Sequence, residues 1–327
     1  MSDQDDEHDH DHDHDHACCG HDHSGEDDEE LTPEELFETI EVAAAEGAFD
    51  EAAMMVAVAH AAFDSGQLDD PILRARFESA QAELERCLGN LDVAAEHAAR
   101  AVTALEALGE EGVRALSGAI YTTALIQLDR EDVDGAMLLL DRAAKLLEAQ
   151  SPVNLDVFAS VLITMGEVSL EVGEPDAAQR LFARVLEVLG DANAESEAKA
   201  RGLNALTGKA FLGLGAAAVQ LGKNVEAKDF LERATEFMDT GLGAGHPVLI
   251  ESLVRIIEIY REMGDMAAVA LAEEELRAAR EAYEAAQDED DEDDEDDDDL
   301  DEDDLDEDGE ELDGEDEPEV EDAQKPN

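Results

Sequence analysis

The central part of the chain, from Leu31 to Gln287, carries apolar residues at the three-and-four spacing of amphipathic α-helices. Runs of about fourteen or more residues with this spacing are separated by short turns that contain Gly or an acidic residue. The pattern therefore predicts an all-α core built from helices in pairs.

The turns repeat at a nearly fixed interval. Gly47-Ala-Phe-Asp-Glu-Ala52 returns as segments that begin at Gly89, Glu131, Gly173, Gly222 and Gly264, and the successive separations are 42, 42, 42, 49 and 42 residues. A fixed period of this length indicates a stacked repeat architecture. The fourth separation is seven residues longer, which places an insertion of about two helical turns near Asp191 to Gly202.

Each repeat unit follows the same internal logic. Gly suits the left-handed conformation that ends a helix, and an acidic residue can cap the helix that follows. Five residues beyond the first turn residue, five of the six units have Ala, which lets two helices approach closely. A second small residue often follows two helical turns later, at Ala59, Ala101, Ala143 and Ala234, with Val185 and Leu276 as exceptions.

Gly47 to Ala52 resembles the helix-turn-helix core of tetratricopeptide repeats. Leu242-Gly-Ala-Gly-His-Pro247, together with the 42-residue period, resembles the kinesin-light-chain type of these repeats. The resemblance implies an α-solenoid of about six tetratricopeptide-type helix pairs over residues 31–287. Glu131 replaces Gly at the third turn. The last pair has Val269 and Glu273 where small or bulky apolar residues are usual, as expected for a capping repeat, whose outer face must be polar because nothing stacks on it.

The two ends of the chain differ sharply from this core. Met1 to Glu30 contains 14 acidic residues, seven of the ten His and no Lys or Arg, and Asp288 to Asp322 contains 28 acidic residues and no base. Such segments cannot bury enough apolar surface to offset the entropy lost on ordering. We expect disordered tails over residues 1–30 and 288–327.

In tetratricopeptide repeats the first helices line a concave groove, so the resemblance implies contacts about two, six, ten and thirteen positions before each turn, and their neighbours. This register selects Glu34, Phe37, Glu41, Arg76, Glu83, Arg86, Tyr121, Asp129, Glu167, Glu171, Lys209, Glu251, Glu258 and Glu262. Most are acidic, which favours a basic or amphipathic segment of a partner protein. A solvated acidic face without a specific partner is the alternative interpretation.

The N-terminal segment contains a second set of chemically distinctive residues. His8, His10, His12, His14, His16, Cys18, Cys19, His21 and His23 alternate with carboxylates and could bind Zn²⁺, Ni²⁺, Co²⁺ or Cu⁺. No spacing defines a single tetrahedral centre, so several exchanging sites are expected. The alternative is a solvated tail with incidental metal affinity.

Three functions follow as hypotheses: a protein–protein interaction scaffold, a metal-binding accessory protein or metallochaperone, and an acidic chaperone for basic proteins. The net charge of −68 disfavours direct binding of nucleic acid. No nucleophile–base pair or phosphate-binding glycine motif points to an enzyme, and no cofactor is required. No secretion signal or run of about 18 apolar residues is present, so a cytoplasmic protein without membrane contact is expected.

Overall fold

The structure, a computed structural model, describes residues 32–190 and 197–298, and within these ranges it is all-α. Its helices are α1 Pro33–Glu46, α2 Phe49–Ser65, α3 Pro71–Cys87, α4 Leu91–Ala107, α5 Val113–Asp129, α6 Val133–Glu148, α7 Leu155–Glu171, α8 Pro175–Gly190, α9 Glu197–Gln220, α10 Asn224–Leu242, α11 Pro247–Met263 and α12 Met266–Asp298, with a short 3-10 helix, η1, at Gly109–Glu111. The predicted six helix pairs are therefore confirmed for the described part of the chain.

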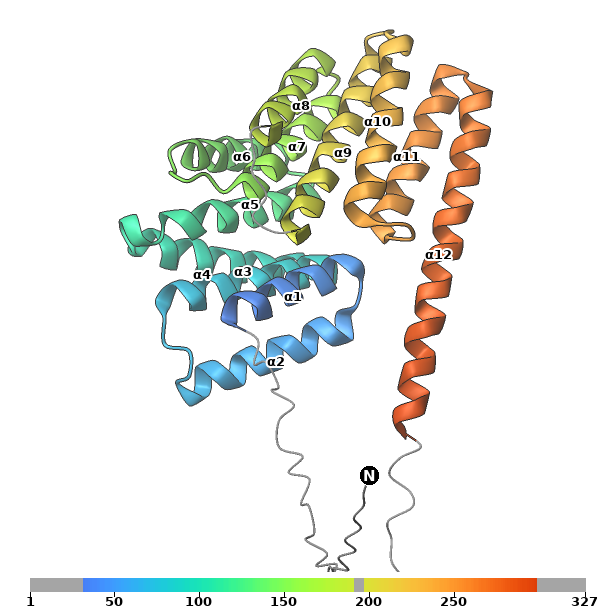
Figure 1. Cartoon of the computed structure of the whole chain (residues 1–327). Coiled ribbons are helices and arrows are strands. Elements are labelled where there is room, and N and C mark those ends of the chain that lie inside the picture. The colour runs from blue at the N-terminus through green and yellow to red at the C-terminus, as the bar shows by residue number, and fades with distance from the viewer. Residues whose placement is uncertain (1–31, 191–196, 299–327) are drawn as a thin grey trace, which may run out of the picture.

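The pairs stack beside one another in chain order, as Figure 1 shows. Each odd-numbered helix packs against the next odd-numbered helix, from α1 through to α11. Each even-numbered helix before α12 packs mainly against its own pair and against the first helix of the next pair. The odd-numbered helices consequently form the inner layer of the solenoid, and the even-numbered helices form the outer layer.

Every one of the six repeated turns has a residue in the left-handed region. Gly47, Gly89, Gly173, Gly222 and Gly264 have φ between 74° and 83°, and Glu131 has φ 63° at the third turn. The turn geometry is thus kept even where Gly is missing. For a residue with a Cβ this conformation costs roughly 1–2 kcal/mol, which the packing of the neighbouring helices must offset.

The small residues after the turns are buried where helices meet. Ala52, Ala94, Ala136, Ala178 and Ala227 are all 0% exposed, and Val269 takes the same position in the last pair at 2%. On α9, a Cβ added to Gly208 would lie 3.1 Å from the carbonyl oxygen of Ala234, and one added to Gly215 would lie 2.6 Å from Leu231. Helices α9 and α10 therefore approach each other so closely that even a Cβ does not fit at Gly208 or Gly215 unless its neighbours shift.

The insertion before the fifth pair lengthens a helix. Helix α9 has 24 residues, whereas α3, α5, α7 and α11 each have 17. The seven additional residues match the longer fourth separation. The irregular junction expected near Asp191 is only partly described, because residues 191–196 lie outside the described ranges.

The last helix continues beyond the boundary that the sequence suggested. Helix α12 ends at Asp298 rather than near Gln287, so the first residues of the expected acidic tail are helical here. Neither Gly nor Pro occurs between Met266 and Asp298, and the Ala and Glu residues before Asp288 favour a helix that propagates into the acidic residues. The rest of both expected tails lies outside the described residues. None of the described helices is both long and apolar enough to cross a membrane.

Candidate partner-binding groove

Two hollows on the inner layer form the main concave feature of the described structure. The first, of about 640 Å³, is lined by residues of α1, α3, α5 and α7, with Glu111 of η1 and Asn154 before α7. The second, of about 700 Å³, is lined by α5, α7, α9 and α11. Tyr121 and Ser160 line both, so the hollows are adjoining parts of one groove.

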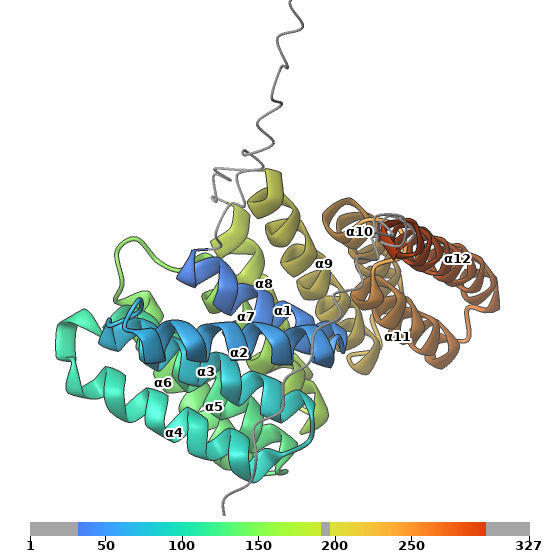
Figure 2. The same ribbon diagram turned by 90° about the horizontal axis from the view of Figure 1, so that it is seen from below.

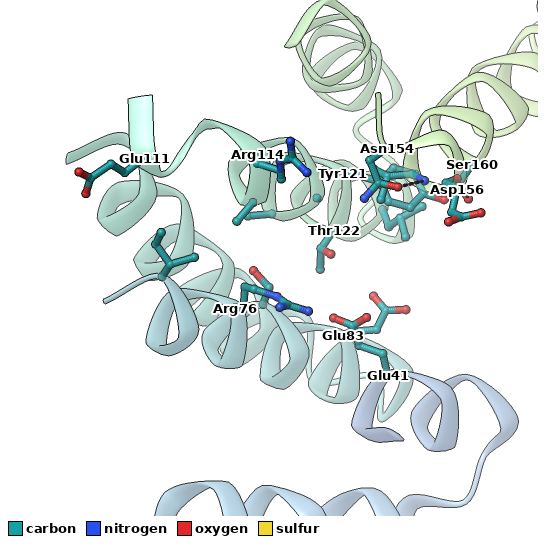
Figure 3. A pocket seen from close by; sticks show the side chains of 17 residues that line it. Glu41, Arg76, Glu83, Glu111, Arg114, Tyr121, Thr122, Asn154, Asp156 and Ser160 are labelled. Carbon is teal, nitrogen blue, oxygen red and sulfur yellow. Dashed lines mark hydrogen bonds between the residues drawn. The ribbon is translucent and has the colours of Figure 1, made fainter. Parts of the chain in front are cut away.

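The first hollow has a mixed lining. Ile72, Ala115, Ala119, Leu125 and Val157 supply apolar surface. Figure 3 shows the polar side chains around it, with Glu41 and Glu83 close together and Arg114 on the opposite wall. A lining that combines apolar surface with a few polar groups is typical of a binding site.

Glu41 and Glu83 lie at one end of this hollow, where the two carboxyl groups repel each other as anions. The pKa of Glu41 rises from 4.5 to about 7, chiefly because the surrounding protein displaces water, and further because Glu83 and Glu38 repel its charge. Arg76 opposes this change. Glu41 is nevertheless exposed, as expected for a side chain in an open groove that water reaches from one side only.

Arg86 and Asp129 were expected in the groove lining but form a clamp beside it. Arg86 donates hydrogen bonds to Glu83 at 2.6 and 3.0 Å and to Asp129 at 2.9 Å, which joins α3 to α5. These bonds, Glu83 above all, raise the pKa of Arg86. The clamp holds Glu83 at the edge of the first hollow.

The second hollow has a similar acidic surface with cations beside it. It is lined by Glu167 and Glu171 of α7, Lys209 of α9, and Glu251 of α11, together with Arg255. Burial raises the pKa of Glu167, Lys209 lowers it, and Glu171 and Glu251 raise it further. Burial is therefore the main reason why the charged form of Glu167 is disfavoured, and Lys209 acts against the two neighbouring glutamates.

Tyr121 stands where the two hollows meet. Its hydroxyl lies 3.1 Å from the hydroxyl oxygen of Thr164, and this hydrogen bond joins α5 to α7 across the groove floor. Burial is the main reason why the pKa of Tyr121 is raised. A neutral aromatic side chain held in this position offers a partner an apolar surface between two acidic regions.

Eight of the predicted groove residues line the two hollows: Glu41, Arg76, Glu83, Tyr121, Glu167, Glu171, Lys209 and Glu251. Arg86, Asp129, Glu258 and Glu262 do not line either hollow, and Glu258 instead accepts a hydrogen bond from Arg255 at 2.9 Å. The side chain of Glu34 is outside the described part of the chain. The predicted metal ligands, from His8 to His23, also fall outside it.

The placement of Phe37 in the groove was wrong. Phe37 is 1% exposed, and its ring stacks with Phe63 at 6.4 Å and Phe77 at 5.7 Å between ring centroids. The guanidinium of Arg76 lies 5.9 Å from the same ring. Phe37 therefore lies beneath the groove, where it packs against Arg76. Burying an aromatic ring in the core stabilises the fold more than leaving the ring exposed in the groove would.

Three residues one helical turn further from the inter-helix turns also line the groove and were not predicted from the sequence. Ile72, Arg114 and Asp156 each lie seventeen positions before a turn residue and line the first hollow. The register from two to thirteen positions had only to be extended by one helical turn to include them. Arg255 was also missed, since it lies one position beyond an ideal register site on α11.

The remaining described histidines have local structural contacts. His97 Nδ1 lies 2.8 Å from Glu78, His60 packs edge-on against Phe77, and His246 accepts a hydrogen bond from the backbone N–H of Val248 at the start of α11. Among the residues that the structure describes, no group of three or more His, Cys, Asp and Glu side chains is arranged to hold a metal ion.

Six stacked helix pairs with left-handed turns and an inner groove define a tetratricopeptide-type α-solenoid, as the sequence resemblance predicted. No protein-family model matches the sequence, and neither does any curated protein. Solved structures are similar in fold. BtubC (BKLC) from P. vanneervenii is 21% identical, with a TM-score of 0.50, over 62% of this chain and 78% of that one.

Two further solved structures have the same type of fold at lower identity. The apo form of RapI is 14% identical, with a TM-score of 0.51, over 77% of this chain and 67% of that one. NprR in complex with its cognate peptide NprX is 9% identical, with a TM-score of 0.52, over 79% and 70% respectively. At these identities the comparisons show the fold.

Proposed function

We propose that the chain is a non-enzymatic interaction scaffold whose groove binds a basic or amphipathic segment of a partner protein. The observation that carries the proposal is the junction of the two hollows at Tyr121 and Ser160, which makes one groove across six helices. Its combined length suits an extended or helical peptide segment better than a single small molecule.

The charge of the lining supports a basic partner. The two hollows contain seven acidic residues, Glu41, Glu83, Glu111, Asp156, Glu167, Glu171 and Glu251, and four basic residues, Arg76, Arg114, Lys209 and Arg255. Glu41 and Glu167 are each destabilised as anions by burial and by neighbouring carboxylates. A Lys or Arg of a partner would relieve this repulsion at both places.

The fold is compatible with peptide binding. NprR, which has a similar solenoid, was solved with its cognate peptide NprX. The interaction proposed for this chain uses its own acidic lining, with Tyr121 as the apolar centre. Apolar partner residues between two basic clusters would match the alternation of acidic, aromatic and acidic surface along the groove.

The test uses a fluorescein-labelled 12-residue peptide of alternating Leu and Lys, and its Leu–Glu counterpart, titrated with the full chain. Only the Lys peptide is expected to bind. Replacing Glu167 and Glu251 together by Gln is expected to weaken binding about tenfold or more, because two charge-assisted contacts are lost. Fluorescence anisotropy at several salt concentrations provides the affinities, and added salt is expected to weaken binding.

The matched control replaces Glu148 and Glu187, exposed residues of the outer helices α6 and α8, by Gln. Both variants change the net charge equally, so non-specific attraction to an acidic chain predicts equal weakening. That result would contradict groove binding and would favour the alternative of an acidic chaperone for basic proteins. A control within twofold of the wild type supports the groove.

We also propose that the segment from His8 to His23 binds metal ions, because its imidazoles, thiols and carboxylates are ligands of Zn²⁺ and Ni²⁺. Calorimetric titration of the full chain is expected to show more than one bound equivalent at pH 7.5 and weaker binding at pH 5.5, where protons compete for imidazoles of pKa about 6.5. Deleting residues 8–23 is expected to abolish uptake, and replacing His60 and His97 by Gln is expected to preserve it. Equal uptake by the deleted chain would refute the proposal.

A further inference from the structure

One arginine recurs at the same position of four outer helices. It lies eleven residues after the first residue of the preceding turn, as Arg100 of α4, Arg142 of α6, Arg184 of α8 and Arg233 of α10. The first three form ion pairs with Glu78, Glu106 and Glu187, at nitrogen–oxygen distances of 2.6 to 3.0 Å. In three of the four helices a glutamate therefore neutralises this arginine.

Arg233 differs from the other three. The central carbon of its guanidinium lies 3.9 Å from the ring centroid of Phe211 on α9, and no acidic side chain of the described residues pairs with it. Glu236 follows Arg233 by three positions, the spacing of the ion pair on α8, but the two do not pair. Arg233 therefore lies against an aromatic ring with its positive charge not neutralised by an ion pair.

Contact with the ring leaves the edge of the Arg233 guanidinium available. A cation–π contact uses the flat face of the group, whereas its N–H donors point outward in the plane. A carboxylate binds to that edge through two parallel hydrogen bonds. The ring of Phe211 is itself stacked with Phe230 and Phe237, whose centroids are 6.3 and 5.5 Å away, so the guanidinium rests on a packed support. Arg233 is thus positioned to bind a planar anion.

Arg233 lines a hollow between α8 and α10. Figures 1 and 2 show α9 between these two helices, and both pack against it. The volume of the hollow is about 450 Å³, and its lining is mainly apolar, with Leu186, Leu189, Leu203, Phe211 and Phe237 as the largest side chains. Within the described part of the chain, Arg233 is the only charged residue of this lining, whereas both hollows of the groove carry charges of each sign. The hollow is therefore an apolar site with one cation.

The hollow uses the face of α9 that points away from the groove. Its residues Ala200, Asn204 and Phe211 share one face of the helix. Lys209 and Ala216, which line the groove, lie about half a turn round the helix from that face. The first seven residues of α9, which include Ala200, have no counterpart in α7. The insertion therefore extends a site that is separate from the groove.

We propose that this hollow binds a small amphipathic anion, a monocarboxylate with an apolar body such as a medium-chain fatty acid. The carboxylate binds the edge of Arg233, and the apolar body lies along Leu186, Leu203 and Phe237. The volume falls within the roughly 300–1,000 Å³ of small-molecule sites. Because the net charge of −68 repels anions at long range, a preference for the anion over a neutral compound of the same shape must arise locally, from Arg233. This inference is independent of the proposed groove function.

The probe for this site is 8-anilinonaphthalene-1-sulfonate, an apolar anion whose fluorescence rises when it leaves water. The full chain is expected to bind it, and octanoate is expected to displace it at least tenfold more effectively than octanamide, which has the same chain without the charge. Arg233→Gln is expected to weaken binding of the probe at least tenfold with unchanged circular dichroism. Arg184→Gln, the matched control at the same repeat position and with the same change of charge, is expected to leave the affinity within twofold of the wild type.

Two substitutions on opposite faces of α9 test the location. Ala200→Phe is expected to fill the hollow and prevent binding of the probe, and Ala216→Phe, at a half-buried residue of the groove face, is expected to preserve it. Equal weakening by Arg233→Gln and Arg184→Gln would overturn the proposal, because it would indicate a general attraction to positive charge. Equal displacement by octanoate and octanamide, probe binding that survives in Ala200→Phe, or no saturable binding of the probe up to 1 mM would overturn it as well.

Discussion

Replacing Ala227 with Phe is expected to destabilise the solenoid by roughly 3 kcal/mol, the upper end of the cost of overpacking a core. Ala227 is 0% exposed on α10, and its carbonyl oxygen would lie 3.6 Å from a Cβ added to Gly215 of α9. Two helices this close cannot admit an aromatic ring without separating. Because each pair is stabilised by its neighbours, separation at α9 and α10 also weakens the contacts of α8 and α11.

The matched control for this substitution lies two residues away on the same helix. Val225 is 88% exposed, so Val225→Phe adds a ring of the same kind without filling a contact. The midpoints of urea and thermal unfolding, followed by circular dichroism, provide the comparison without assuming a two-state transition. Ala136→Phe and Leu138→Phe make the same comparison on α6, where the residues are 0% and 74% exposed. Equal midpoints within either pair would show the helix contacts to be wrong.

The repeat architecture could be predicted from the sequence because its signals are local. A turn residue with positive φ, a capping acid and a small residue five positions later all lie within one short segment. Glu131 shows that the period carries more information than any single residue, since it adopts φ 63° at a position where the other five turns have Gly. A search for Gly would have missed this turn.

Features that depend on packing between distant segments were predicted less well. The pattern showed seven inserted residues but could not show that they lengthen α9. Phe37 fits the groove register, yet Phe63 and Phe77 from two other helices draw it into the core. The continuation of α12 to Asp298 depends on helix propagation into a segment whose composition by itself favours disorder.

The sequence indicated which helix positions line the groove, but not which charged residues pair beside it. Glu83, Tyr121 and Glu167, which helical spacing selected, line the two hollows of the inner layer. Helical spacing could not show that Arg86 binds both Glu83 and Asp129, because that contact joins residues 43 positions apart in the chain. The shifted pKa of Glu41 also arises from its surroundings in space, so no sequence pattern could have indicated it.

Replacing Glu41 with Gln is expected to stabilise the protein above pH 7 and to have little effect near pH 5. The pKa of Glu41 is about 7 in the folded chain against an ordinary value of 4.5, so folding favours the protonated form. That contribution is fully present below pH 4.5 and is lost as the pH rises through 7. Gln mimics the neutral carboxyl at every pH. The gain at pH 8 is about 1 kcal/mol, less than the pKa shift by itself implies, because water reaches and screens this exposed side chain.

Thermal unfolding of wild type, Glu41→Gln and the control Glu148→Gln at pH 5 and pH 8 measures this effect, and a difference for Glu41→Gln that does not change with pH would contradict it.

The protonation of Glu41 also makes peptide binding in the groove depend on pH. A cationic peptide beside Glu41 favours the carboxylate, so binding near pH 7 is expected to release a proton and to tighten between pH 6 and pH 8. Titration calorimetry in buffers of different ionisation enthalpy detects that proton. Its loss in Glu41→Gln, with peptide binding retained, would identify Glu41 as its source, whereas unchanged release would place the titrating group elsewhere.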